Sequence, residues 1–131
     1  MWSNEESRSS LEQPEGVTDR YTFAPDGWYL CRHCSNPIAN ESDHTEAEGH
    51  HRHTFTNPMG STFRIACFHL APGVLAVSEE TTKDTWFTGC AWSIVVCSNC
   101  AAHLGWRFRG LKMQFYGLIL SQIVHSPQPD V

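Results

Sequence analysis

The chain has 131 residues, of which 40% are hydrophobic, and a formal net charge of −5 at pH 7. This length predicts one domain. The excess of acidic residues argues against a nucleic-acid partner, because binding to phosphates depends on clustered lysine and arginine. The polar start does not resemble a signal peptide, and no apolar run is long enough to cross a membrane. We therefore expect a cytoplasmic protein that does not associate with membranes.

The two ends of the chain differ in composition from the middle. Residues 1–20 are rich in serine, glutamate and other polar residues and have no apolar period, so we expect a disordered leader. Residues 126–131 contain two prolines and predict a flexible tail. The expected folded domain spans residues 21–125.

Between these ends, short apolar segments alternate with turns that contain Gly, Pro and Asn, which is typical of β-strands. Strands are expected at residues 27–30, 54–56, 62–70, 74–77, 85–97 and 105–109. Residues 35–52 are polar and rich in histidine, so we expect a loop there. The apolar run 115–124 fits either a buried strand or a helix, and its aromatic and β-branched residues favour a strand. The sequence predicts an all-β domain of about eight short strands.

Two Cys-x-x-Cys pairs are separated by a long insert, a spacing that favours a zinc site over a disulfide framework. The four residues are Cys31, Cys34, Cys97 and Cys100. Four thiolates complete a tetrahedral zinc site without an open position, which is the structural kind of site. A pair of disulfides or a redox pair is the alternative, but neither pair lies in the βαβ context of a redox motif. We expect one structural zinc ion.

The remaining thiols and clustered histidines predict no second metal site. Cys67 lies on the apolar side of an expected strand and is interpreted as a buried, inert thiol. Cys90 lies in a Gly-Cys-Ala turn, and its state is left open. His50, His51 and His53 could capture zinc, but a solvated loop is the favoured interpretation.

Three tryptophans, Trp86, Trp92 and Trp106, flank the second cysteine pair. From their spacing alone they could belong either to the core or to an aromatic pocket. Trp28 is expected in the core.

A long string of residues around the second cysteine pair resembles the CULT domain family, the thalidomide-binding domain found in cereblon. The string is Trp86-Phe87-x-Gly-x-Ala91-Trp92 followed by Cys97-x-x-Cys100-Ala-x-His-Leu-Gly105-Trp106. Further matching segments are Trp28-Tyr29-Leu30-Cys31-x-x-Cys34, Asn57-Pro58-x-Gly60 and Phe115-Tyr116-Gly117-Leu118. The resemblance covers residues 27–124, so the CULT-like domain corresponds to the expected folded region.

The resemblance implies a β-tent of two antiparallel sheets pinned by the four-cysteine zinc. It also implies a non-enzymatic pocket for cyclic imides, such as glutarimide and thalidomide analogues, and for uracil-type rings such as uridine. A protein chain that ends in a cyclic imide is a further implied ligand. The implied ligand-binding residues are the cage tryptophans Trp86, Trp92 and Trp106, the lip residues Asn57 and Pro58, the closing residues Phe63 and Phe108, and Asp84.

The chemistry of a cyclic imide suits such a pocket. Its polar edge carries one N–H donor between two carbonyl acceptors, while the rest of the ring is apolar. Indole faces can cover the apolar part, and backbone groups at the rim can bind the polar edge. By the family pattern, the carbonyl of Asp84 accepts from the imide N–H and the amide of Trp86 donates to an imide carbonyl.

Three departures from the family pattern alter what is expected of this chain. Animal cereblons carry histidine in place of Asp84, and an ionised carboxylate cannot donate a hydrogen bond, so we expect weaker binding or a changed ligand preference. Met59 also replaces a histidine, outside the cage. The chain resembles stand-alone, bacterial-type members, so no contact with a ubiquitin-ligase adaptor is expected.

Two other functions are compatible with parts of this pattern. An aromatic cage can hold a methylated ammonium group by cation–π attraction, and Asp84 at its rim would suit a cation. Methionine sulfoxide reductases of the B type share the β-tent and the paired Cys-x-x-Cys motifs. Their nucleophilic cysteine follows the second pair, but this chain has no cysteine after Cys100. We therefore expect a recognition module and not an enzyme.

Overall fold

The computed structural model describes residues 27–126. The predicted leader lies outside the described residues, as does the predicted tail apart from its first residue. No helix within the described range has the length and apolar character needed to cross a membrane.

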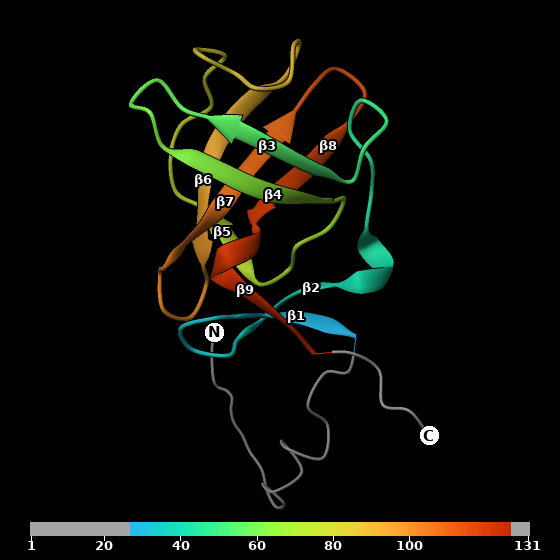
Figure 1. Cartoon of the computed structure of the whole chain (residues 1–131), viewed down its shortest axis with the longest axis vertical. Coiled ribbons are helices and arrows are strands. Elements are labelled where there is room, and N and C mark those ends of the chain that lie inside the picture. The colour runs from blue at the N-terminus through green and yellow to red at the C-terminus, as the bar shows by residue number, and fades with distance from the viewer. Residues whose placement is uncertain (1–26, 127–131) are drawn as a thin grey trace, which may run out of the picture. The chain divides into compact units, whose positions relative to one another are not determined.

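Residues 27–126 form nine strands and two short 3-10 helices (Figure 1). The strands are β1 (Trp28–Cys31), β2 (Pro37–Asn40), β3 (Arg52–Thr56), β4 (Thr62–Phe68), β5 (Val74–Ala76), β6 (Ala91–Cys97), β7 (His103–Arg109), β8 (Gln114–Ile119) and β9 (Ile123–Ser126). The 3-10 helices are η1 (Glu41–Asp43) and η2 (Leu120–Gln122). This confirms the all-β prediction.

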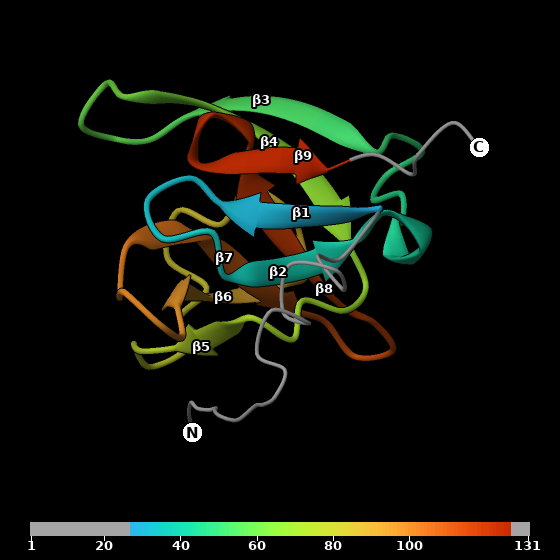
Figure 2. The ribbon, with the colours of Figure 1, turned by 90° about the horizontal axis from the view of Figure 1, so that it is seen from below.

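The strands form two antiparallel sheets. A three-stranded sheet has the order β2-β1-β9, and a six-stranded sheet has the order β3-β4-β8-β7-β6-β5. Seen from below, β9, β1 and β2 lie across one face of the larger sheet (Figure 2). The two antiparallel sheets implied by the resemblance to the CULT family are therefore present.

Three expected elements differ from the observed ones. Strand β2 lies inside the expected loop at 35–52. Its two fully buried residues, Ile38 and Ala39, are too few to produce a recognisable hydrophobic period in the sequence. The apolar run 115–124 is two strands, since η2 takes the chain from the larger sheet to the smaller one. The expected strand 85–97 begins only at Ala91, because turns occupy the residues before it. In one of these turns the Cys90 amide donates to the Phe87 carbonyl.

The larger sheet carries one apolar cluster on each face. Along β4, Ala66 and Phe68 face the three-stranded sheet, whereas Ile65 and Cys67 face the opposite side, as the two-residue period of a strand requires. Burying one such large side chain contributes about 1.5–3 kcal/mol to folding. Both faces of this sheet therefore stabilise the domain.

The expectation that Trp28 belongs to the core is wrong. Trp28 is only half-buried, and its neighbour Tyr29 belongs to the cluster between the sheets instead. Successive residues of a strand point to opposite faces, so only one of the two can face the core.

Glycine at two positions on the neighbouring strands β7 and β8 permits close packing in the centre of the larger sheet. A Cβ atom on Gly105 would lie 2.0 Å from the carbonyl oxygen of Gly117. A Cβ atom on Gly117 would lie 2.7 Å from Cδ1 of Ile65 and 3.1 Å from the ring of Phe108. The missing side chain of Gly117, which pairs with Trp106 across β7 and β8, therefore leaves room for Ile65 and Phe108.

Candidate metal centre and aromatic pocket

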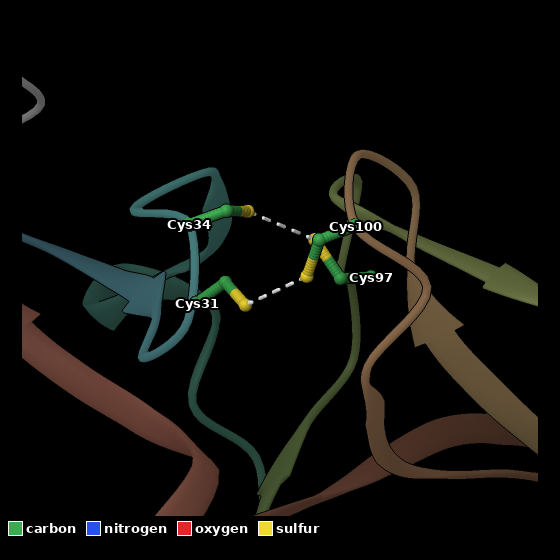
Figure 3. Close-up of side chains that lie close together, drawn as sticks. All are labelled: Cys31, Cys34, Cys97 and Cys100. Atoms are coloured by element: carbon green, nitrogen blue, oxygen red, sulfur yellow. Dashed lines mark hydrogen bonds between the residues drawn. The ribbon is translucent and has the colours of Figure 1, made fainter.

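The four predicted zinc ligands converge from two distant parts of the chain. Cys31 ends β1 and Cys97 ends β6, while Cys34 and Cys100 lie in the turns that follow (Figure 3). All four Sγ atoms lie within 4.8 Å of one another, and the Cys31–Cys100 and Cys34–Cys97 Sγ distances are both 3.6 Å. A tetrahedron with Zn–S bonds of about 2.3 Å places its sulfurs roughly 3.8 Å apart, so the cluster fits one zinc ion.

The two cysteine turns have the same local backbone conformation. The Ser35 amide donates to the Cys31 carbonyl at 2.8 Å, and the Ala101 amide donates to the Cys97 carbonyl at 2.9 Å. Ser35 and Ala101 both have positive φ angles, of 65° and 67°. This repeated turn directs two sulfurs of each pair to one point, which is the geometry of a zinc knuckle.

Neighbouring groups orient one of the sulfurs and affect its charge. The Asn99 amide lies 3.4 Å from Sγ of Cys97, and the Asn36 side-chain amide lies 3.6 Å from the same sulfur. Donors of this kind position metal-bound thiolates. Burial raises the pKa of Cys31 to about 12, against the opposing effect of backbone amides, and burial also raises the pKa of Cys97. A cation must therefore displace protons from these two thiols.

The other cysteines and the clustered histidines lie outside this centre. Cys67 and Cys90 are both buried, and burial raises the pKa of Cys67 to about 12, which agrees with an inert thiol. Within residues 27–126 only the four-cysteine cluster could hold a metal. The His51 ring bonds the Thr45 carbonyl, and the His53 ring stacks on Phe55, so these side chains support the loop.

A cavity of about 600 Å³ lies on the face of the larger sheet that is turned away from the three-stranded sheet. All eight residues predicted from the family pattern line it: Asn57, Pro58, Phe63, Asp84, Trp86, Trp92, Trp106 and Phe108. Its volume lies within the range of small-molecule sites. That these residues bind a ligand stays a prediction.

Strand register places the tryptophans of β6 and β7 on the cavity face. Trp92 pairs with Phe108 and Ile94 pairs with Trp106, so these four side chains form neighbouring rows on one face. A register shift between Val95 and Val96 interrupts the ladder beyond them. The rows make the floor of the cavity apolar and largely aromatic.

The aromatic walls are packed edge to face. The rings of Trp86 and Trp106 are 4.8 Å apart at 73°, and those of Phe63 and Trp106 are 5.1 Å apart at 76°. Phe55 stacks on the outer side of Trp86 at 4.9 Å. Trp92 is held separately, because its indole N–H donates to the Lys83 carbonyl at 2.8 Å. Each indole is thus fixed by its own contacts.

Two backbone groups of cavity-lining residues lack a hydrogen-bond partner among the described residues. Asp84 has φ +55°, an unusual conformation for a residue with a side chain and one that is enriched at functional sites. Within residues 27–126, neither the Asp84 carbonyl nor the Trp86 amide takes part in a hydrogen bond. These are the two groups that the family pattern assigns to the imide edge.

Four lining residues were not predicted: Thr81, Lys83, Ile94 and His103. The alternation from Trp92 would have found Ile94. His103 lies on the same face as Trp106 only because of the register shift, and its ring lies 5.0 Å from that indole. Burial lowers the pKa of His103, and its Nε2–H donates to the Gly105 carbonyl at 3.1 Å.

Comparison with known proteins places these features in a family. A family described as "Yippee zinc-binding/DNA-binding /Mis18, centromere assembly" matches residues 28–119, a range that includes all four zinc ligands. The chain belongs to the Yippee-Mis18 family. The zinc-binding part of this description agrees with the four-cysteine centre.

Several curated relatives are cereblons. The chain is 30% identical over 114 residues to protein cereblon of Drosophila simulans, a match that covers 78% of this chain and 19% of the relative. It is 30% identical over 82 residues to protein cereblon of Xenopus tropicalis, covering 58% of this chain and 18% of the relative. The chain spans about a fifth of the length of these relatives. The resemblance to the cereblon CULT domain is confirmed, and the chain is a cereblon-like zinc-binding module.

Proposed function

We propose that this domain is a non-enzymatic recognition module that binds cyclic imides and uracil-type rings between Trp86, Trp92 and Trp106. The observation that carries the proposal is the convergence of these indoles around one cavity of about 600 Å³. Indole faces would cover the apolar body of the ring, which removes apolar surface from water without requiring a charged partner.

The backbone before Trp86 supplies groups that match the polar edge of an imide. The Asp84 carbonyl would accept from the imide N–H, and the Trp86 amide would donate to one imide carbonyl. Each is free of hydrogen bonds to other residues in the range 27–126. A ligand with this edge satisfies both groups, whereas a ring that lacks it would leave them unpaired at a cost of about 1–3 kcal/mol each if buried.

Two features of the cavity argue for recognition of a neutral ring and against the alternatives. Among the described residues that line it there is no cysteine, so no thiolate is available to attack a sulfoxide. A methylated ammonium group would be attracted by Asp84 but repelled by Lys83, which also lines the cavity. The natural ligand would be a free small molecule or a protein chain that ends in a cyclic imide, with no ubiquitin-ligase adaptor required.

Titration of the zinc-loaded protein with uridine, a glutarimide and a quaternary ammonium salt tests this proposal, with tryptophan fluorescence as the readout. We expect saturable binding of the two rings and none of the ammonium salt. Trp86→Ala and Trp106→Ala should lower affinity for both rings at least tenfold while zinc content stays at one per chain. Unchanged affinity in both variants, or measurable sulfoxide reduction, would refute the proposal.

A further inference from the structure

The segment that precedes Asp84 runs beside β6 and is attached to it at several points. Thr81 and Trp92 exchange two backbone hydrogen bonds, of 2.8 and 3.0 Å. The Lys83 carbonyl accepts from the Trp92 indole, and the Lys83 amide donates to the Thr81 hydroxyl at 3.1 Å. The backbone of Lys83 is therefore fixed at the edge of the cavity.

The charges of this segment divide between the two faces of the sheet. Thr81 and Lys83 line the cavity, whereas Glu80 pairs with the guanidinium groups of Arg107 and Arg109. Arg107 lies opposite Ser93, whose side chain points away from the cavity, so Glu80 is engaged on the other face. The Glu80 carboxylate is thus engaged by two arginines and does not pair with Lys83.

Lys83 and Asp84 are the charged residues of the described cavity lining. Among residues 27–126, no ion pair joins Lys83 to a carboxylate. The flexible four-carbon stem of lysine lets its ammonium group reach a ligand at the rim. The Asp84 side chain is shorter, and its backbone has a positive φ. Within residues 27–126, no carboxylate therefore competes with a ligand for this ammonium group.

The cavity is also larger than one six-membered ring requires. Sites of about 300–1,000 Å³ hold drug-sized molecules, and this one measures about 600 Å³. A ring held between the tryptophans leaves room for a substituent that extends toward the polar lining residues.

We propose that Lys83 makes this pocket select ring ligands that carry an anionic substituent, a phosphate or a carboxylate. This inference rests on the proposed function and specifies its ligand class. Lysine binds such anions as a point charge. The Asp84 carboxylate repels the same anion, so the preference is moderate. A solvent-exposed ion pair between the Lys83 ammonium group and the ligand anion is expected to strengthen binding by about two- to fivefold.

Paired ligands that differ by the presence of one anionic group test this directly. Uridine is compared with uridine 5′-monophosphate, and N-acetyl-3-aminoglutarimide with its N-succinyl analogue, by calorimetric titration in a phosphate-free buffer of low ionic strength. The two pairs separate a preference for phosphate from one for carboxylate. Lys83→Gln removes the charge, and Lys112→Gln, an exposed lysine outside the cavity lining, is the matched control.

We expect the anionic member of at least one pair to bind two- to fivefold more tightly, with the difference shrinking as salt is added. Lys83→Gln should abolish the difference between the two members of the pair, and Lys112→Gln should leave that difference intact. Equal or weaker binding of both anions, or a preference that survives Lys83→Gln, overturns this inference alone. Failure of both neutral rings to bind overturns the proposed function together with it.

Discussion

Trp92 and Cys97 lie five residues apart in β6 and point to opposite faces of the larger sheet. Cys97 belongs to the metal centre beside the three-stranded sheet, and Trp92 is a wall of the cavity on the other side. An odd separation along a strand produces this arrangement. The metal centre and the cavity therefore share one strand, and the position of Trp92 depends on the anchoring of β6.

This shared strand predicts that loss of zinc disables the cavity as well as the fold. Cys100 is exposed, so Cys100→Ser removes a metal ligand with little change in packing. We expect a loss of several kcal/mol of folding free energy, because metal binding and folding are coupled in such sites. Thermal unfolding followed by circular dichroism, with and without a chelator, measures this loss. Ser98→Ala, in the same turn, is the control. A cooperative transition and normal ring binding in the Cys100→Ser variant would contradict the coupling.

Packing around Gly117 predicts a rescue by a second substitution. Gly117→Ala would place a Cβ atom 2.7 Å from Cδ1 of Ile65, and such overpacking costs about 1–3 kcal/mol. Ile65→Val removes that methyl group, so the double variant should recover part of the loss in a chemical denaturation experiment. Strictly additive losses in the double variant would show that the Ile65 contact is not the cause.

The ion pair of Glu80 predicts a pH-dependent contribution from the segment that carries Lys83. Arg109, with a smaller effect of Arg107, lowers the pKa of Glu80. A carboxyl whose pKa is lower in the folded state stabilises it at pH values above the unfolded pKa of 4.5, and this contribution is lost as the pH falls through the lowered folded value. Glu80→Gln should therefore lower the melting temperature slightly at pH 7, and this effect should shrink as the pH falls below 4.5; the variant should also weaken ring binding. Glu79→Gln is the matched control, and an equal effect in both variants would count against the pair.

A second pH effect is expected from His44. Its ring lies 4.0 Å from that of His51, and burial together with this neighbour lowers the pKa of His44. The folded state therefore disfavours the proton, so the stabilising contribution is complete above the unfolded pKa of 6.5 and is lost as the pH falls below it. The drop in melting temperature between pH 7.5 and 5.5 should be smaller in His44→Gln than in the native chain. His50→Gln, an exposed histidine nearby, serves for comparison, and an identical drop in His44→Gln would rule out this role.

The sequence predicted the metal centre and eight residues of the cavity lining because both depend on recognisable motifs. Four cysteines at knuckle spacing specify their own convergence, and the spacing of the tryptophans matched a known domain family. Thr81 and Lys83 could not be predicted in this way, because their position depends on how a non-periodic segment aligns with Trp92. Strand β2 was missed for a related reason, since the burial of Ile38 and Ala39 is set by the opposing sheet.

The proposed function depends on recognition of the polar edge of an imide by the backbone of Asp84 and Trp86. The most direct measurement compares a glutarimide with its N-methylated derivative in calorimetric titrations of the zinc-loaded protein. Methylation removes the one N–H donor and leaves the apolar body of the ring in place. We predict at least a tenfold loss of affinity, which corresponds to about 1.4 kcal/mol for one lost hydrogen bond with its acceptor left unpaired. Equal affinity for the two compounds would show that the cavity does not recognise the imide N–H.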